Sequence, residues 1–275
     1  MAYATLRFER DGNVGWLRLF RPDRLNAFTP EMWRELRELG EELRDDPELR
    51  ALVVIGEGRA FSSGIDTSVF AGDTLDGDTL ETDRDAPRRH DDPAVDAIMQ
   101  TQDAYTWLEE APYATIAAVR GYALGAGLQL ALACDVRVFA EGTQAGLLEF
   151  KYGILPDLGG TQRLPRAVGA AKAKELIFTA GQVDADEALR IGLTQRVVPD
   201  AELEAAAGEL AATIAAQPPL AVEGAKRAVN VAGTVPTREG LRIEAEGQAA
   251  CLRSDDMKEA IAAFVEQRPP SYQRR

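Results

Sequence analysis

Three glycines within seven residues precede an apolar helical run, and they constrain the fold more than any other feature of this chain. The segment reads GYALGAGLQLALACD, residues 121–135. The glycines lack the G-x-G-x-x-G spacing of a dinucleotide-binding turn, and no Gly-Lys-Ser/Thr follows as in a phosphate-binding loop. A strand is expected to end at Arg120 and a helix to begin near Ala126. The glycines then either expose unpaired helical N–H groups to a ligand or allow tight packing of helix against strand.

The spacing of apolar residues predicts an α/β fold. Residues 5–22 alternate apolar and polar side chains around Asp-Gly-Asn, which predicts a β-hairpin. A helix is expected over 29–45, with Thr29 as its cap and Pro30 at its first position. The segments 114–121, 123–133 and 134–140 read as strand, helix and strand, so part of the sheet is parallel. Further expected elements are strands at 51–57 and 194–198 and helices at about 93–110, 170–180 and 184–191.

The amino-acid composition and the expected secondary structure both change at Asp200. From there to Gln267 the chain is helical and rich in Ala and Glu, interrupted near 217–220 and 233–237. We therefore divide the chain into a core, residues 1–199, and a helical C-terminal region, residues 200–275. Residues 72–92 are rich in Asp, Gly, Thr and Arg and are expected to form a surface insertion, either a lid or a solvated loop.

Composition narrows the possible partners. The 275 residues carry a net charge of −14, from 45 acidic and 31 basic side chains. This charge disfavours nucleic acid and anionic membranes as partners, and an anionic ligand would need local basic groups. Cys134 and Cys251 have no zinc or disulfide spacing, and no apolar run approaches the ~20 residues of a membrane span. We expect a soluble protein in the reducing cytoplasm.

The single histidine limits the possible chemistry. His90 lies in the polar segment DRDAPRRHDDP and is expected to be solvated. Nucleophilic sites of the Ser-His-Asp or Cys-His type require a positioned imidazole, and a histidine-rich metal site requires several. We expect no metal site, and acid–base chemistry must fall to carboxylates.

A second turn of the same kind occurs at RAFSSGIDTSVF, residues 59–70. Two such turns can supply two N–H donors, as an oxyanion hole requires. The combination of AFSSGID, GYALGAG and ACD resembles the crotonase (enoyl-CoA hydratase/isomerase) superfamily. RLNAF, GGTQRLPRAVG and MKEAIAAFVEQR extend the resemblance over nearly the whole chain.

The resemblance implies a crotonase-like spiral of ββα turns with a C-terminal helical trimerisation region. It also implies an acyl-CoA substrate, no cofactor beyond the coenzyme A of that thioester, and a homotrimer or dimer of trimers. The oxyanion-hole donors would be the backbone N–H groups of Ile65 and Ala126. By the same resemblance, contacts to substrate or coenzyme A fall on Arg24, Ala27, Ala60, Ser62, Gly64, Asp66, Gly125, Phe264 and Arg268. Phe264 and Arg268 would reach the ligand of a neighbouring subunit.

The carboxylates depart from the pattern of the family's hydratases, which use two glutamates. Gln129 stands at the first position and Glu149 at the second. An amide holds water but cannot exchange a proton at neutral pH. Asp157, eight positions after Glu149, is either a second carboxylate or a turn residue; as a carboxylate it resembles the family's double-bond isomerases.

We therefore expect an enoyl-CoA isomerase that acts through a thioester enolate. Its catalytic residues would be Glu149 and Asp157, with Gln129 beside them. The alternatives are an enoyl-CoA hydratase of fatty-acid β-oxidation, in which Gln129 replaces one glutamate, and a non-catalytic acyl-CoA-binding member of the family. A dinucleotide-dependent oxidoreductase is the weakest alternative, because its glycine motif is missing.

Overall fold

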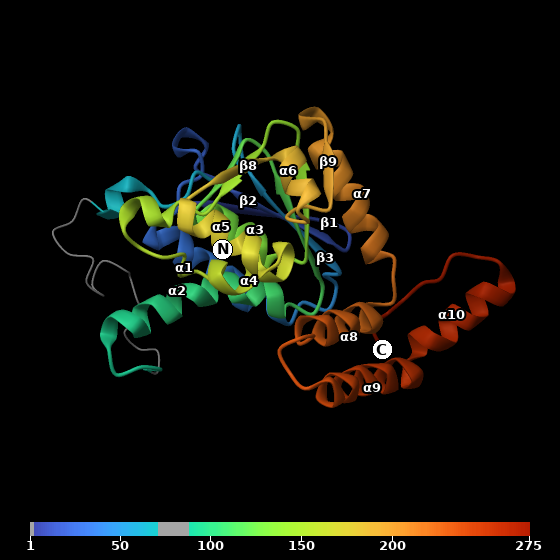
Figure 1. Cartoon of the computed structure of the whole chain (residues 1–275). Helices are drawn as coiled ribbons and strands as arrows, with labels where there is room; N and C mark the ends of the chain where they lie inside the picture. The colour runs from blue at the N-terminus through green and yellow to red at the C-terminus, as the bar shows by residue number, and fades with distance from the viewer. Residues whose placement is uncertain (1–2, 71–87) are drawn as a thin grey trace.

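The computed structural model describes residues 3–70 and 88–275 and shows a mixed α/β architecture (Figure 1). A six-stranded sheet has the order β1-β2-β3-β4-β6-β9, and a three-stranded sheet has the order β5-β7-β8. The strands of the larger sheet are β1 (Leu6–Asp11), β2 (Val14–Leu19), β3 (Ala51–Gly56), β4 (Ala114–Val119), β6 (Val136–Ala140) and β9 (Arg196–Val198). Those of the smaller sheet are β5 (Tyr122–Leu124), β7 (Gln144–Gly146) and β8 (Gln182–Asp184). Most of the predicted segment 72–92 lies outside the described residues.

The expected N-terminal hairpin is confirmed. β1 and β2 are antiparallel, and the Asp-Gly-Asn turn places Gly12 at φ +57°. The other pairs of the larger sheet are parallel. β3 and β4 are buried at every residue, which explains their continuous apolar sequences. The predicted strand–helix–strand unit corresponds to β4, α3 (Ala126–Ala133) and β6.

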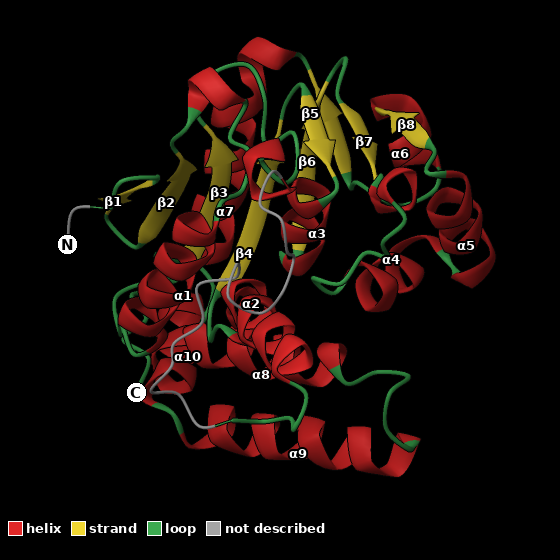
Figure 2. Ribbon diagram, turned by 90° about the vertical axis from the view of Figure 1, so that its left-hand side faces the viewer, coloured by secondary structure: helices red, strands yellow, loops and turns green. Residues whose placement is uncertain are grey.

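Helices cover both faces of the larger sheet (Figure 2). On one face, the small residues Ala207 and Ala211 of α7 (Leu203–Ala215) pack on a cluster that includes Val53 and Ile116. On the other face, α1 (Pro30–Arg44), α2 (Pro93–Glu110) and α3 contribute to the main core. Thr29 caps α1 as expected, since its side chain accepts a hydrogen bond from Met32 N. The remaining helices of the core are α4 (Gly160–Val168), α5 (Ala170–Thr179) and α6 (Ala185–Arg190).

Two elements differ from the sequence-based prediction. The segment 123–133 reads as a helix in sequence, but Ala123 and Leu124 belong to β5, which pairs with β7. The helix itself begins at Ala126, as the glycine segment predicts, after Gly125 adopts φ +51°. The helix α4 was not predicted because Pro165 lies within it, and proline disfavours a helix interior.

Three further helices end the chain: α8 (Pro219–Asn230), α9 (Thr237–Arg253) and α10 (Asp255–Glu266). Lys226 connects α8 to the core. Its Nζ lies 2.9 Å from Asp135 Oδ2 and donates a hydrogen bond to Leu108 O at 2.8 Å. The backbone N–H of Asp255 donates to Arg275 O, which returns the C-terminus to the start of α10. Within the described residues, no helix has the length and apolar character needed to cross a membrane.

Candidate active site

Two turns that lie far apart in sequence pair along their backbones. Ser62 N donates to Tyr122 O at 2.8 Å, and Leu124 N donates to Ser62 O at 3.0 Å. Phe61 N donates to Arg120 O at 2.9 Å. The segment after β3 therefore lies beside the glycine-rich segment, as the oxyanion-hole hypothesis requires.

The glycines differ in their surroundings: Gly127 meets the close-packing explanation, whereas Gly125 borders the candidate site and leaves the ligand explanation a prediction. A Cβ on Gly127 would lie 2.7 Å from the Ser62 Cβ, so this glycine allows the two segments to pack closely. A Cβ on Gly125 would lie 3.3 Å from the Glu149 Oε1, so this glycine borders a carboxylate. Its φ of +51° also favours glycine.

A pocket of about 60 Å³ opens where the two turns meet. Its walls are residues of the segments 63–67, 124–126 and 148–154. The expected donors, Ile65 and Ala126, both line it. Neither of their backbone N–H groups has an acceptor among the described residues. Ile65 is held by its parallel bridge to Phe28, whose N–H donates to Gly64 O at 2.8 Å.

Glu149 is the carboxylate of this pocket. It begins the 3₁₀-helix Glu149–Tyr152 and is only 4% exposed. Its Oε1 accepts a hydrogen bond from Gln129 Nε2 at 2.7 Å, whereas its buried Oε2 has no partner within residues 3–70 and 88–275. Burial raises the pKa of Glu149 to about 7, and the negative charge of Asp157 adds to this rise. A group with such a pKa exchanges protons readily near neutral pH.

Gln129 lies behind Glu149 and outside the pocket lining. It is buried in α3, and its Oε1 accepts hydrogen bonds from Leu158 N at 2.8 Å and Gly160 N at 2.9 Å. Because these two donors fix the amide oxygen, the amide nitrogen must face Glu149. The side chain therefore holds the Glu149 carboxylate in place from the rear.

Asp157 lies in the turn before α4 and is half-buried. Burial raises the pKa of its carboxyl group. Its carbonyl oxygen accepts a hydrogen bond from Gln102 Nε2 at 2.6 Å. Asp157 is not among the residues that line the pocket with Glu149. Its connection to Glu149 in this structure is electrostatic.

The other predicted contact residues fall into two groups. Gly64 and Gly125 line the pocket, whereas Ala27, Ala60, Ser62 and Asp66 lie in the loops that support it. Ser62 Oγ donates to Asn26 O at 2.8 Å, and Asp66 pairs with Arg21 at 2.9 Å. Asp66 also accepts hydrogen bonds from Ser68, and these are the main reason that its pKa falls to about 2.

The remaining three predicted contact residues also lie outside the pocket lining. Arg24 is exposed on the 3₁₀-helix Pro22–Arg24. Phe264 is 85% exposed on α10, and Arg268 pairs with Glu259 and Glu266 of its own chain. His90 is exposed as expected, and its Nδ1 accepts a hydrogen bond from Asp92 N. Among the described residues there is no cluster of His, Cys, Asp and Glu suited to a metal ion.

Sequence reasoning missed two supporting residues. Asn26 joins three segments, since its Nδ2 donates to Glu57 O and Ala60 O and its Oδ1 accepts from Arg21 N. The hydroxyl of Tyr105 donates to Ala126 O at 3.1 Å from helix α2. Asn26 lies inside the RLNAF motif, which could have revealed it. No sequence pattern connects Tyr105 with the glycine turn.

Comparison with known proteins supports the same family as the sequence motifs. A family model described as enoyl-CoA hydratase/isomerase matches residues 9–275. The probable enoyl-CoA hydratase EchA8 of Mycobacterium tuberculosis is 39% identical, with both chains fully covered. The crotonyl-CoA hydratase of Syntrophomonas wolfei is 33% identical, with 99% of each chain covered.

Solved structures confirm the predicted crotonase-like fold. An enoyl-CoA hydratase from Bacillus anthracis superposes with a TM-score of 0.88 at 32% identity, covering 98% of this chain and 100% of its own. A putative enoyl-CoA hydratase from Thermobifida fusca in complex with CoA superposes with a TM-score of 0.80 at 40% identity. That match covers 91% of this chain and 93% of the other.

Proposed function

Because this chain belongs to the enoyl-CoA hydratase/isomerase family, we propose that it hydrates a 2-enoyl-CoA, with Glu149 as the proton-transferring group. One observation carries the proposal. The unpartnered Oε2 of Glu149 belongs to the same pocket as the unpaired N–H groups of Ile65 and Ala126. A thioester carbonyl bound to those N–H groups would place the adjacent carbons near the carboxylate.

The proposed reaction uses one carboxylate twice. Glu149 Oε2 accepts a hydrogen bond from a water molecule and removes its proton as the oxygen attacks carbon 3 of the enoyl group. The double-bond electrons move onto the thioester oxygen, where the N–H groups of Ile65 and Ala126 stabilise the enolate. The carboxyl group of Glu149 then returns the proton to carbon 2. The elements of one water molecule are thereby added across the double bond.

The names of the relatives support hydration over the isomerisation that we expected from the sequence. In this proposal Gln129 is a positioning residue, because its amide oxygen accepts from Leu158 N and Gly160 N and its amide nitrogen donates to Glu149. It does not replace the missing acid, so Glu149 must perform both proton transfers.

Double-bond isomerisation is the second candidate function. Its support is that Glu149 is the only carboxylate among the described residues that line the pocket. A single carboxylate can remove a proton from carbon 2 of a 3-enoyl-CoA and return it to carbon 4 without any water. Asp157 would assist only if substrate binding brings its carboxyl group toward the acyl chain.

We further propose that Arg24 contacts the phosphates of coenzyme A, since it is exposed close to the supporting loops. Phe264 and Arg268 would act on the ligand of a neighbouring subunit in a trimer or dimer of trimers. In a single chain Arg268 is engaged by Glu259 and Glu266, so this role requires it to exchange partners.

A substrate panel tests these functions together. Matched 2-enoyl-CoA and 3-enoyl-CoA thioesters are incubated with the wild-type protein and with Glu149→Gln, and the products are separated. Formation of 3-hydroxyacyl-CoA from the 2-enoyl substrate supports hydration, and conversion of 3-enoyl to 2-enoyl thioester supports isomerisation. Binding of both thioesters without any product would contradict both and favour an acyl-CoA-binding protein.

A further inference from the structure

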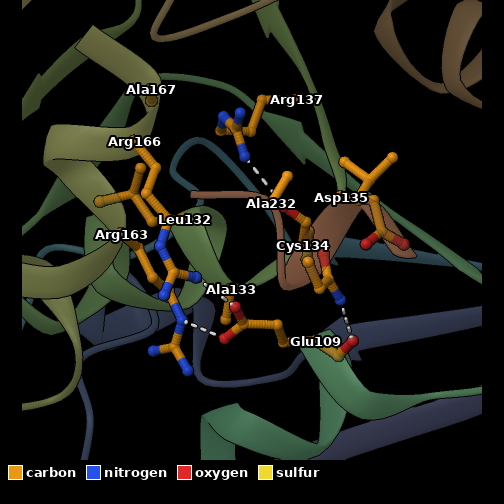
Figure 3. A pocket seen from close by; sticks show the side chains of 12 residues that line it. Glu109, Leu132, Ala133, Cys134, Asp135, Arg137, Arg163, Arg166, Ala167 and Ala232 are labelled. Atoms are coloured by element: carbon orange, nitrogen blue, oxygen red, sulfur yellow. Dashed lines mark hydrogen bonds and ion pairs between the residues drawn. The ribbon is translucent and has the colours of Figure 1, made fainter. Parts of the chain in front are cut away.

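A larger hollow of about 370 Å³ lies apart from the Glu149 pocket and shares no lining residue with it. It is bordered by the end of α3, by α4 and by the end of α8 (Figure 3). Three arginines line it, Arg137, Arg163 and Arg166, against two carboxylates, Glu109 and Asp135. This excess of positive charge is unusual for a chain whose net charge is −14.

Arg137 is the residue that most needs an explanation. It lies on β6 and is only 7% exposed. Its Nε donates to Leu193 O at 2.6 Å and its Nη1 to Cys134 O at 2.9 Å. No carboxylate forms an ion pair with it in the described part of the chain. Burial lowers the pKa of its guanidinium, which reflects the cost of holding a charge away from water.

The two nearby carboxylates are already engaged by other groups. Asp135 pairs with Lys226 at 2.9 Å and accepts a hydrogen bond from Thr115 N at 2.8 Å. Glu109 pairs with Arg163 and Arg166, each at 2.9 Å. The guanidinium of Arg137 points into the space between α4 and residues Cys134 and Asp135 (Figure 3). Among the described residues, the guanidinium of Arg137 has no acceptors beyond Leu193 O and Cys134 O, and its side chain lines the hollow.

We propose that this hollow binds one oxyanion group, a carboxylate or a phosphate, through Arg137, with Arg166 as a second cation. A planar guanidinium matches the oxygen spacing of both groups and can bind them through paired hydrogen bonds. Burial strengthens such a contact relative to a surface arginine and shields it from salt. Arg166 reaches the same hollow from α4 and is half exposed, so it can turn toward a bound anion.

The oxyanion has two possible sources. One is a small anion in solution, and the other is a carboxylate of a second copy of this chain, which offers 45 acidic residues. Inorganic phosphate is the probe for the first source. Calorimetric titration of the wild-type protein should show saturable binding, and Arg137→Met should weaken it by about tenfold or more, the loss expected for a hydrogen bond to a charged group. Arg166→Gln should weaken it less.

A control variant separates this site from other arginines. Arg190→Gln removes an exposed arginine of α6 and should bind phosphate as the wild type does. Because Arg137→Met could disturb folding, circular dichroism melting is recorded for each variant. Arg166→Gln then provides a second test at a position where the fold depends less on the side chain.

The second source is tested by light scattering in phosphate-free buffer. If a carboxylate of another copy fills the hollow, wild type will not take up phosphate, and Arg137→Met and Arg166→Gln will both lower the molecular mass. Either pattern supports an oxyanion site at Arg137. The proposal is overturned if wild-type, Arg137→Met and Arg166→Gln proteins show the same phosphate titration and the same mass.

Discussion

One carboxylate, Glu149, carries the proposed chemistry at the residue scale. Replacement by glutamine keeps the shape and the contact with Gln129 but removes the basicity. General acid–base groups contribute about 10²–10⁴-fold, so Glu149→Gln should lower kcat by that factor with little change in KM. Glu141→Gln, an exposed glutamate after β6, is the matched control and should retain full activity. Steady-state kinetics checks both, and an active Glu149→Gln would remove Glu149 from the mechanism.

The raised pKa of Glu149 makes a prediction about pH. As a general base it must be ionised, so kcat/KM should rise with pH and reach half of its plateau near the pKa of about 7. Asp157→Asn should move this midpoint to lower pH, because the negative charge of Asp157 raises the pKa of Glu149. The measurement is the pH profile of kcat/KM for both proteins. A midpoint that stays in place would mean that Asp157 does not act on Glu149 during catalysis.

Gln129→Glu tests the role of the residue behind the carboxylate. The new carboxylate would keep the hydrogen bonds from Leu158 N and Gly160 N but place its second oxygen opposite Glu149 Oε1, where the amide nitrogen now lies at 2.7 Å. Two oxygens at that distance must share a proton, so the midpoint of the pH profile should rise. Gln129→Met removes the hydrogen bond to Glu149 without adding a charge, so it should raise the midpoint of the pH profile less than Gln129→Glu does. Equal midpoints in all three proteins would contradict the positioning role.

At the scale of elements, the site depends on how the 59–66 and 121–127 segments pair. Gly125→Ala would strain a backbone at φ +51° and add a Cβ 3.3 Å from Glu149 Oε1. Gly142 is the matched control, since its φ is +77° and a Cβ there meets nothing within 4 Å. Gly142→Ala should lose roughly 1–2 kcal/mol of stability and Gly125→Ala at least as much, but only Gly125→Ala should also lower kcat. Thermal melts and kinetics separate the two effects, and equal kinetics would show that Gly125 does not shape the site.

The sequence predicted most elements because their causes are local. The cap at Thr29, the Asp-Gly-Asn turn and the continuous apolar strands act within a few residues of chain. β5 was not predicted because so short a strand depends on pairing with distant segments, here β7 and the turn at Ser62. The candidate site was located from its motifs. The position of Gln129 behind Glu149 was not, because it depends on Leu158 and Gly160, which arrive there through the turn before α4.

At the scale of the whole molecule, the C-terminal helices leave apolar surface uncovered in a single chain. Ile261, Phe264 and Val265 of α10 are 55%, 85% and 74% exposed. Such a cluster favours association, and we predict a trimer or a dimer of trimers. Ile261→Lys should lower the molecular mass measured by light scattering, whereas Leu189→Lys on α6, also at an exposed apolar residue, should not. A wild-type monomer with full activity would exclude the role proposed for Phe264 and Arg268.

Assembly and the division between residues 1–199 and 200–275 stay predictions. α7 belongs to the second region by sequence, yet it packs on the larger sheet as part of the core cluster. Only the helices after it, α8 to α10, stand together beyond the sheet (Figure 1). A change in composition marks where helices begin, but it does not show which of them the sheet needs for its second face.

Deuterium exchange in the acyl group tests whether Glu149 moves protons to and from an enolate held by Ile65 and Ala126, because both candidate reactions require that enolate. A 2-enoyl-CoA and its 3-enoyl isomer are incubated in D₂O with wild-type and Glu149→Gln protein, and deuterium in the acyl group is measured by mass spectrometry. The wild type should introduce deuterium at carbon 2 of the hydrated product, because that proton comes from solvent water. If it isomerises, deuterium reaches carbon 4 only in the fraction of turnovers in which the Glu149 carboxyl group exchanges its proton with D₂O before returning it. Glu149→Gln should be slower by about 10²–10⁴-fold in either reaction. Deuterium incorporation by Glu149→Gln at the wild-type rate would show that Glu149 does not transfer these protons.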